Sequence, residues 1–307
     1  MKRLYKLEGI IIVSTMKGFF VPFLLLLILI PRVSEANMII GGETVYVVEK
    51  GDTFELIGAK LGVNWRNIVK RNAFDCKKIL RVGQKLKVNT RKIVPKVIND
   101  GIVINIPDRM LYLFEKTELK SAFPVGLGMP SWRGITRWRT PAGKFRVIKK
   151  LTNPTWYVPE SIQRKMKMRG ETVKTVIQPG PQNPLGRYAI KISIRGILIH
   201  ETIWPSTVYQ YKSHGCIRVL PKHMGKFFEE VKINTIGELI YRPVKVAVSE
   251  KGRIFLEIHR DSYGKVKDLR IEARRVIEAW GVAHKVNWQK VDIVLKEKSG
   301  IAEDITL

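Results

Sequence analysis

The stretch YKSHGCIRVLP, residues 211–221, places Ser213, His214, Gly215 and Cys216 in four consecutive positions. The chain has only two cysteines, and Cys216 is one of them. A thiol attacks as a thiolate, so its ordinary pKa of about 8.5 means that it needs a base or a cation beside it. Four meanings are open for such a cysteine: an inert buried thiol, half of a disulfide, a metal ligand or a nucleophile.

Two histidines are candidates to activate Cys216. His214 lies two positions before the thiol, so both side chains share one face if the backbone is extended. His200 lies near the end of the strand-like stretch GILIHET, residues 196–202, from which a loop and a return could bring it beside the thiol. Gly215 permits unusual backbone dihedrals and leaves room for a substrate carbonyl against the amides of Gly215 and Cys216, as in an oxyanion hole. The groups needed for acyl transfer therefore lie in one short segment.

These residues resemble the catalytic signature of the L,D-transpeptidases with a YkuD-type domain. In that signature a His precedes Ser/Thr-His-Gly-Cys, and a hydrophobic residue and then Arg or Asn follow. The stretches RTPAGKF (139–145) and NPLGRYAI (183–190) agree with it as well, and the resemblance spans about residues 101–246. Repeated short strands with Pro-Gly turns over the same range predict a mainly-β catalytic domain, a β-sandwich-like fold or a barrel, with few helices.

The resemblance implies a role for the residues of the motif. Cys216 would be the nucleophile and His200 the base, with His214 as a supporting active-site histidine. The amides of Gly215 and Cys216 would form the oxyanion hole, and Arg218 would make a structural or substrate-facing polar contact. The implied catalytic residues are therefore His200, Ser213, His214, Gly215, Cys216 and Arg218.

The implied reaction is a two-step acyl transfer on peptidoglycan. The thiol attacks the carbonyl of the L-centre diamino acid in a tetrapeptide stem and expels the terminal D-amino acid, which leaves a thioester. An amine of a neighbouring stem then gives a 3→3 cross-link, or an envelope protein serves as the acceptor; attack by water would instead make an L,D-carboxypeptidase. The family needs no metal or other cofactor and is typically sensitive to carbapenems. Glu201 departs from the pattern, because many members have a small residue there, and it is expected to narrow the pocket.

Other interpretations of the motif stay open beside this one. An inert core thiol is the default for a lone cysteine. A zinc site from His200, His214, Cys216 and His223 fits no common spacing, and nothing local brings Cys76 to Cys216 for a disulfide. A non-catalytic wall-binding protein with a decayed active site is a further alternative, against which the complete Cys–His set argues. The tryptophans in basic, loop-like stretches either line a substrate groove or simply pack: Trp132, Trp138 and Trp156.

Residues 45–90 are typical of a compact strand–helix–helix–strand unit. Asp52 or Thr53 is placed to cap the first helix, and Asn64 to cap the second. The unit resembles the LysM module, matching it at Tyr46, Val48, Gly51-Asp52-Thr53, Ile57, Asn72, Leu80 and Gly83-Gln84. This resemblance implies binding to N-acetylglucosamine-containing glycans such as peptidoglycan, with substrate-binding contacts carried over to Gly51, Asp52 and Thr53.

The N-terminal region, residues 1–36, has the pattern of a signal peptide. MKGFFVPFLLLLILIPRVSEAN, residues 16–37, combines a Lys, an apolar run and small residues before a cleavage site after Ala36, and Met16 is a plausible true start. The run is short for a membrane span of about 20 residues, although an uncleaved segment would attach the protein to a membrane. We therefore expect export to the periplasm or cell envelope. Export argues against nucleic acid as the partner of a chain with a formal charge of +28 and favours a wall or membrane surface.

Residues 247–307 predict a small accessory α+β extension without an assignable motif. SEKGRIFLEIHRD (249–261) continues as a hairpin, and DLRIEARRVIEAWG (268–281) is an amphipathic helix with capping residues at both ends. His259 and His284 lie here without evident partners. The sequence therefore predicts a multidomain chain with four parts: a signal region at 1–36, the LysM module at 45–90, the catalytic domain at 101–246 and the extension at 247–307.

Overall fold

The computed structural model describes residues 5–7, 10–12, 38–75, 79–131, 134 and 138–307. The chain divides into two compact units, Met1–Ser34 and Glu35–Leu307. In the first unit, strands β1 (Tyr5–Leu7) and β2 (Ile10–Ile12) pair antiparallel. The predicted apolar signal run, its cleavage site and Cys76 lie outside the described residues. Within the described ranges, no helix combines the length and the apolarity that a membrane span requires.

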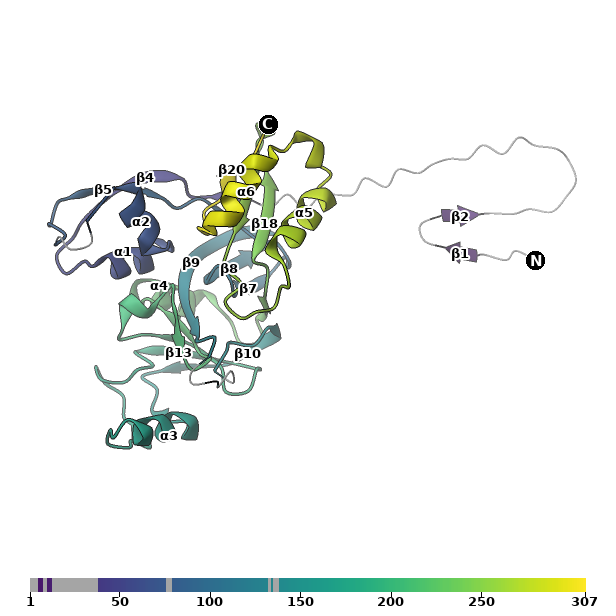
Figure 1. Cartoon of the computed structure of the whole chain (residues 1–307). Coiled ribbons are helices and arrows are strands. Elements are labelled where there is room, and N and C mark those ends of the chain that lie inside the picture. The colour runs from purple at the N-terminus through teal and green to yellow at the C-terminus, as the bar shows by residue number, and fades with distance from the viewer. Residues whose placement is uncertain (1–4, 8–9, 13–37, 76–78, 132–133, 135–137) are drawn as a thin grey trace, which may run out of the picture. The chain divides into compact units, whose positions relative to one another are not determined.

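An N-terminal module in the second unit has the strand–helix–helix–strand order that the sequence predicts. Its elements are β4 (Glu43–Val47), α1 (Phe54–Leu61), α2 (Trp65–Arg71) and β5 (Lys85–Asn89), with β4 antiparallel to β5 (Figure 1). The Thr53 hydroxyl accepts a hydrogen bond from the Leu56 amide at 3.1 Å, and the Asn64 side chain accepts one from the Arg66 amide at 3.1 Å. These caps start the two helices, as the sequence predicts. The short strands β3 (Ile39–Ile40) and β6 (Lys92–Ile93) pair beside the module.

The middle of the chain forms a closed β-barrel. Among the described residues, nine strands make up its sheet: β7 (Gly101–Asn105), β8 (Met110–Glu115), β9 (Glu118–Gly128), β10 (Gly143–Thr152), β13 (Tyr188–Ile192), β14 (Leu198–Glu201), β15 (Tyr211–Ser213), β16 (Ile217–Val219) and β17 (Ile236–Ile240). Their order is β15-β9-β16-β14-β13-β10-β17-β7-β8, and the long, curved β9 also pairs with β8 (Figure 1). The sheet therefore closes on itself, with β15 attached beside β9. The mainly-β prediction is confirmed.

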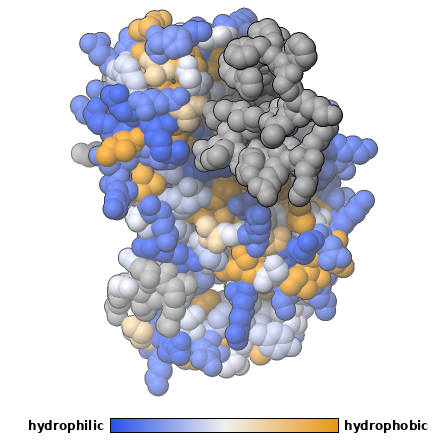
Figure 2. Space-filling view, turned by 90° about the vertical axis from the view of Figure 1, so that its right-hand side faces the viewer, coloured by the Kyte–Doolittle hydropathy of each residue, from blue (hydrophilic) through white to orange (hydrophobic). Residues whose placement is uncertain are grey.

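The barrel interior is filled by β-branched and other apolar side chains. Alternate residues of the strands point inward, and Ile104, Val147, Ile199, Ile217 and Val219 are fully buried in one cluster. Helix α4 (Pro221–Glu230) begins directly after Leu220 and buries Met224 and Phe227 against the same cluster. Outside the core, hydrophilic side chains predominate on the face drawn in Figure 2, with apolar ones scattered among them.

Between β10 and β13 the chain leaves the barrel in an excursion that the sequence did not predict. It contains β11 (Trp156–Tyr157), α3 (Glu160–Met168) and β12 (Val176–Ile177), and α3 has no buried residue. Asn183 holds the returning chain, because its buried amide donates to the Pro154 carbonyl at 2.8 Å and its oxygen accepts from the Leu185 amide at 2.9 Å. The excursion is therefore anchored at its base, and α3 projects beyond the barrel (Figure 1).

The C-terminal extension is α+β, as predicted. A sheet of β18 (Val244–Val248), β19 (Ile254–Ile258) and β20 (Glu303–Asp304) packs against α5 (Leu269–Ala279) and α6 (Trp288–Glu297) (Figure 1). The 3₁₀ turns η1 (Pro205–Thr207) and η2 (Ala283–Lys285) complete the fold. The Asp268 carboxylate accepts from the Arg270 amide at 2.7 Å and caps α5, which confirms the helix start expected there.

A buried ionic network joins this extension to the barrel. The Lys245 ammonium lies 2.6 Å from the Asp108 carboxylate and 3.0 Å from that of Glu257, and all three side chains are almost fully buried. Glu257 also accepts from the Ile93 amide at 2.6 Å and lies 2.6 Å from the His259 ring. His259 therefore has a partner that the sequence did not reveal. Burial opposes ionisation of Glu257, but Lys245 and His259 outweigh it and lower its pKa to about 2.

Replacing Lys245 with methionine should lower the free energy of unfolding by about 3–5 kcal/mol, because two carboxylates would be left buried without their cation. Urea unfolding followed by circular dichroism measures this loss. The matched control is Lys70→Met, which removes the exposed ion pair with Glu297 and should cost less than about 1 kcal/mol. Equal losses in the two variants would contradict a structural role for the buried network.

Candidate active site

Cys216 lies in the turn between β15 and β16 as a free thiol. Side chains alternate along a strand, and Ile217 and Val219 point into the barrel core, where they are fully buried. Cys216 and Arg218 therefore project from the opposite face. There they line a cavity of about 1080 Å³ together with His200, Ser213 and His214.

The strand β14 brings His200 to the same face as the thiol. His200 pairs with Arg218 in the parallel register of β14 and β16, and directly paired side chains leave a sheet on the same side. Since Cys216 is two positions before Arg218, it shares that side with His200. His200 therefore lies on the same face as the Ser-His-Gly-Cys turn because β14 and β16 are adjacent parallel strands.

The protonation of His200 follows from its hydrogen bond. Its Nδ1 lies 2.5 Å from the backbone carbonyl of Glu201, and a carbonyl only accepts, so Nδ1 carries the proton. The Nε2 lone pair is left for another proton. Burial lowers the pKa of His200 to about 4, against the opposing effect of the Glu201 hydrogen bond. The ring is therefore neutral near pH 7 and able to act as a base.

His214 contacts side chains, Lys165 and Trp138, whereas His200 bonds to a backbone carbonyl. Its Nε2 lies 3.2 Å from the ammonium of Lys165, which has only donors, so the His214 lone pair accepts that bond. Its ring stands edge-to-face against Trp138 with centroids 4.4 Å apart. Burial and the nearby Lys165 charge lower the pKa of His214 to about 4. Of the two histidines, His200 is thus the better placed to receive a proton.

Burial also raises the pKa of the Cys216 thiol, although the Leu198 backbone and the Arg218 charge favour the thiolate. With a neutral imidazole at His200, the resting pair is a thiol and a base rather than a thiolate and an imidazolium. The arrangement therefore suits removal of the thiol proton as the nucleophile attacks.

The turn that carries Cys216 is shaped by its neighbours. The Ser213 hydroxyl donates to the Cys216 carbonyl at 2.6 Å and accepts from the Gly215 amide at 3.2 Å. Gly215 has φ +113°, and an added Cβ would lie 3.1 Å from the Ile197 side chain, so glycine is required here. Because the Gly215 amide already donates to Ser213, its predicted oxyanion role requires that it exchange this bond.

A tyrosine from the C-terminal extension supports the same turn. Thr140 donates through its hydroxyl to the Gly215 carbonyl at 2.8 Å, and its amide donates to the Tyr263 hydroxyl at 3.1 Å. Tyr263 in turn donates to the Gly128 carbonyl at 2.6 Å. Thr140 belongs to the RTPAGKF stretch that agrees with the signature, whereas Tyr263 was not predicted, because no local pattern links a residue of the extension to the motif.

Tyr263→Phe should therefore slow acylation of Cys216 and lower the free energy of unfolding by about 1–3 kcal/mol, because a buried carbonyl and a buried amide lose their partner. Urea unfolding and the acylation rate of the same preparations test both effects. The matched control is Tyr157→Phe, since Tyr157 is 74% exposed. A Tyr263→Phe protein with unchanged rate and stability would show that this hydroxyl does not support the turn.

Glu201 faces away from the cavity. Its carboxylate accepts from the Arg187 amide at 3.3 Å, and an added Cβ on Gly186 would lie only 2.6 Å from the Glu201 Cβ. The described residues that line the cavity do not include Glu201. Its side chain therefore packs on the Gly186 turn and does not narrow the pocket as expected, while its carbonyl orients His200.

Two of the three tryptophans in question line the cavity. Trp138 is buried against His214, and Trp156 lines the cavity at the start of the excursion; Trp132 lies outside the described residues. Helix α3 adds Lys165 and Met166 to the same wall. The cavity is thus bounded by the barrel on one side and by the unpredicted excursion on the other.

The residues predicted to contact glycan lie in the turn before α1. The Asp52 side chain is fully buried, accepting from the Tyr46 hydroxyl at 2.7 Å and pairing with Lys60 at 2.8 Å. Burial opposes ionisation of Asp52, but these bonds outweigh it and lower its pKa. Thr53 caps α1, and Gly51 has φ +85°. The glycan contacts of these three residues remain a prediction. The side chains of Asp52 and Thr53 already form hydrogen bonds within the module.

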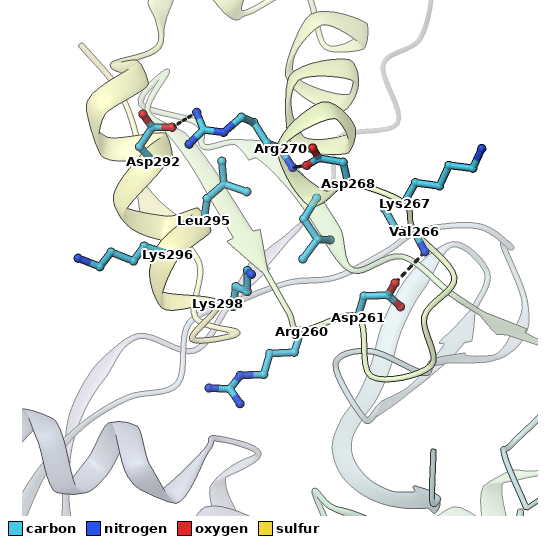
Figure 3. Close-up of a pocket in the computed structure, with 11 residues that line it drawn as sticks. Arg260, Asp261, Val266, Lys267, Asp268, Arg270, Asp292, Leu295, Lys296 and Lys298 are labelled. Atoms are coloured by element: carbon cyan, nitrogen blue, oxygen red, sulfur yellow. Dashed lines mark hydrogen bonds and ion pairs between the residues drawn. The ribbon is translucent and has the colours of Figure 1, made fainter. Parts of the chain in front are cut away.

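A second depression lies in the C-terminal extension. It has a volume of about 670 Å³, and Figure 3 shows Arg260, Lys267, Lys296 and Lys298 around it, with Arg270 paired to Asp292. The described residues that line it include neither a thiol nor an imidazole. It therefore lacks the groups that nucleophilic acyl transfer needs.

The other histidines of the described chain do not join Cys216. His223, expected at the surface, is half-buried and stacks on Phe123 with centroids 5.1 Å apart. His259 lies with Asp108 and Glu257 in a group with metal-ligand geometry, but the Lys245 ammonium holds the position that a cation would take.

Comparisons with known proteins identify two domains in the chain. Residues 99–247 match the model of the L,D-transpeptidase catalytic domain (YkuD), and residues 46–89 match that of the LysM domain. The probable L,D-transpeptidase ErfK/SrfK of Salmonella typhimurium is 27% identical over 94% of this chain and 96% of its own length. The probable L,D-transpeptidase YbiS of Escherichia coli is 27% identical over 75% of this chain and 74% of its own length.

Among solved structures, the catalytic domain of the E. faecium L,D-transpeptidase acylated by ertapenem is 20% identical over 48% of this chain and 100% of that chain, with a TM-score of 0.35. By its matches to the two domain models and the curated relatives, the chain carries a LysM domain followed by an L,D-transpeptidase catalytic domain, and it is an enzyme of that class.

Proposed function

We propose that the protein is an exported L,D-transpeptidase that uses Cys216 as its nucleophile on peptidoglycan stems. The observation that carries this proposal is the shared face of Cys216 and His200, with the proton of His200 fixed on Nδ1 by the Glu201 carbonyl at 2.5 Å. A free thiol and a neutral imidazole on one wall of a cavity are the groups that acyl transfer requires.

In the first step, Nε2 of His200 takes the thiol proton while Sγ of Cys216 bonds to the carbonyl carbon of the L-centre diamino acid. The Cys216 amide donates to the oxyanion in this proposal, and the Gly215 amide would join it by releasing Ser213. The tetrahedral intermediate collapses as the bond to the terminal D-amino acid breaks. His200 returns its proton to the leaving amine, so the products are a thioester and a free D-amino acid.

In the second step an acceptor amine attacks the thioester and His200 takes its proton. The carbon–sulfur bond breaks, the thiolate recovers the proton, and a new amide is formed. An amine of a neighbouring stem would give a 3→3 cross-link, and an amine of an envelope protein would attach that protein to the wall. Water in place of the amine would yield a trimmed stem, as an L,D-carboxypeptidase does.

The LysM domain and the N-terminal segment support a wall location for this reaction. A glycan-binding domain tied to the catalytic domain raises the local concentration of stems by holding the enzyme on its polymer. The signal-like pattern of residues 16–37 supports export to the periplasm or cell envelope. Sequencing the mature N-terminus tests this directly: a chain that starts at Asn37 is expected, and a cytoplasmic, unprocessed chain would refute export.

Muropeptide mass spectrometry tests the activity. Purified protein incubated with tetrapeptide-rich sacculi should release the terminal D-amino acid and form 3→3 cross-linked dimers, whereas Cys216→Ala should leave the profile unchanged. Tripeptide accumulation without dimers would favour trimming over cross-linking. An unchanged profile with the wild-type protein would contradict both.

A further inference from the structure

The active-site cavity carries an excess of positive charge. Its described lining includes five cationic side chains and one carboxylate: Lys165, Arg169, Lys174, Arg195, Arg218 and Glu171. The Glu171 carboxylate lies 3.6 Å from Arg169. Arg195 and Arg218 form no ion pair with any described carboxylate. The neutral rings of His200 and His214 do not add charge near pH 7.

An excess of positive charge inside a cavity is energetically unfavourable, because like charges repel more strongly where water is partly excluded. Lys165 shows the effect, since burial and the nearby Arg169 and Arg218 charges lower its pKa. An anionic ligand would relieve this repulsion. The cavity is therefore electrostatically suited to a substrate that carries carboxylates.

Lys165 brings one of these charges to His214, a histidine of the active-site motif. It projects from α3, and its ammonium lies 3.2 Å from Nε2 of His214 and 5.2 Å from the centre of the Trp138 ring. His214 is separated from Cys216 only by Gly215. The contact with His214 is with a neutral ring. A carboxylate would accept the same kind of hydrogen bond and add the attraction of an opposite charge.

The proposed substrate places a carboxylate in this region. Its leaving residue is the terminal one, so it bears a free carboxylate on the same residue as the nitrogen of the broken bond. Adjacent Cα atoms are about 3.8 Å apart, which puts that carboxylate within roughly one residue of the attacked carbonyl. Lys165 lines the same cavity as Cys216, so a stem bound there would bring its terminal carboxylate toward this cation.

We infer that Lys165 forms a subsite for the terminal carboxylate of the acyl donor, so that the enzyme selects stems ending in a free D-amino acid over stems whose terminus is blocked. This inference rests on the proposed function, whose substrate it specifies. Lys165 is then a specificity-determining residue supplied by the excursion, with Arg169 and Arg218 reinforcing the field around it.

Binding measured in a Cys216→Ala background tests the subsite without turnover. Isothermal titration uses a tetrapeptide stem and the same peptide with a terminal carboxamide. With Lys165 present, the acid should bind about tenfold more tightly than the amide, as expected for one charge-assisted hydrogen bond. Lys165→Met should abolish this preference and leave the affinity for the amide unchanged, and Lys165→Arg should retain it.

Lys296→Met is the matched control, because it removes a lysine from the other depression (Figure 3) and should keep the tenfold preference. If Lys165→Met weakened binding of the acid and the amide peptide equally, Lys165 would have a packing role and the inference would be overturned. It would also be overturned if Lys165→Met kept the preference for the acid, or if neither peptide bound when Lys165 is present. Release of D-amino acid by the wild-type enzyme is assayed separately. Its absence beside acid-selective binding would refute the proposed reaction and leave the subsite standing.

Discussion

Cys216→Ala is expected to reduce D-amino acid release and 3→3 cross-linking to background. Without the thiol no acyl-enzyme forms, and the two-step route has no first step. The same variant should lose acylation by a carbapenem. The rate of D-amino acid release from a tetrapeptide, compared with the wild-type protein at equal concentration, measures the effect.

The two cysteines of the chain make this variant informative. Cys76 remains in Cys216→Ala, so a carbapenem adduct that persists must lie on Cys76 or on another residue. Cys76→Ala is the complementary control and should keep full activity. A Cys216→Ala protein that releases D-amino acid at the wild-type rate would refute the assignment of the nucleophile.

His200→Gln should lower kcat/KM for D-amino acid release by about 10²–10⁴-fold, the range for loss of a positioned general base. Glutamine keeps a polar side chain of similar length on β14 but cannot take a proton near neutral pH. His214→Gln is the contrast, because the His214 lone pair is held by Lys165 and its loss should cost less. If His214→Gln were the more damaging change, the assignment of the base would be reversed.

The pH dependence of kcat/KM tests the protonation state of His200 independently. Its pKa is lowered to about 4 by burial, and the ring acts as a base only when neutral. Activity should therefore persist through the ordinary histidine range and fall only as the pH drops through about 4, provided that the fold survives. A kcat/KM profile with its acid limb near 6.5 would contradict a buried, neutral His200.

Much of the fold was predictable because it depends on local patterns. Turn residues and alternation over residues 101–246 identify short strands, and capping residues such as Asn64 and Asp268 mark helix starts that the structure confirms. The closure of the barrel was not predictable. It depends on β9 pairing with both β8 and β16, a choice of partners that period-two alternation does not specify.

The candidate site divides in the same way. Cys216 and His200 could be identified because Ser-His-Gly-Cys is contiguous and His200 lies a short distance before it, in a strand-like stretch. Lys165 and Tyr263 could not, since one comes from a helix without buried residues and the other from the extension. Both reach the site through tertiary packing, for which a single sequence has no periodic signal. Glu201 seemed to obstruct the pocket because sequence alone does not show that its side chain turns toward Gly186.

The central claim is that Cys216 carries the acyl group between donor and acceptor. Intact-protein mass spectrometry during turnover of a defined tetrapeptide, quenched with acid and followed by peptide mapping, tests it most directly. The account predicts a mass increase equal to the acyl group of the donor after loss of its terminal D-amino acid, located on Cys216 and absent from Cys216→Ala. Product formation without that adduct, or with the adduct on another residue, would contradict it.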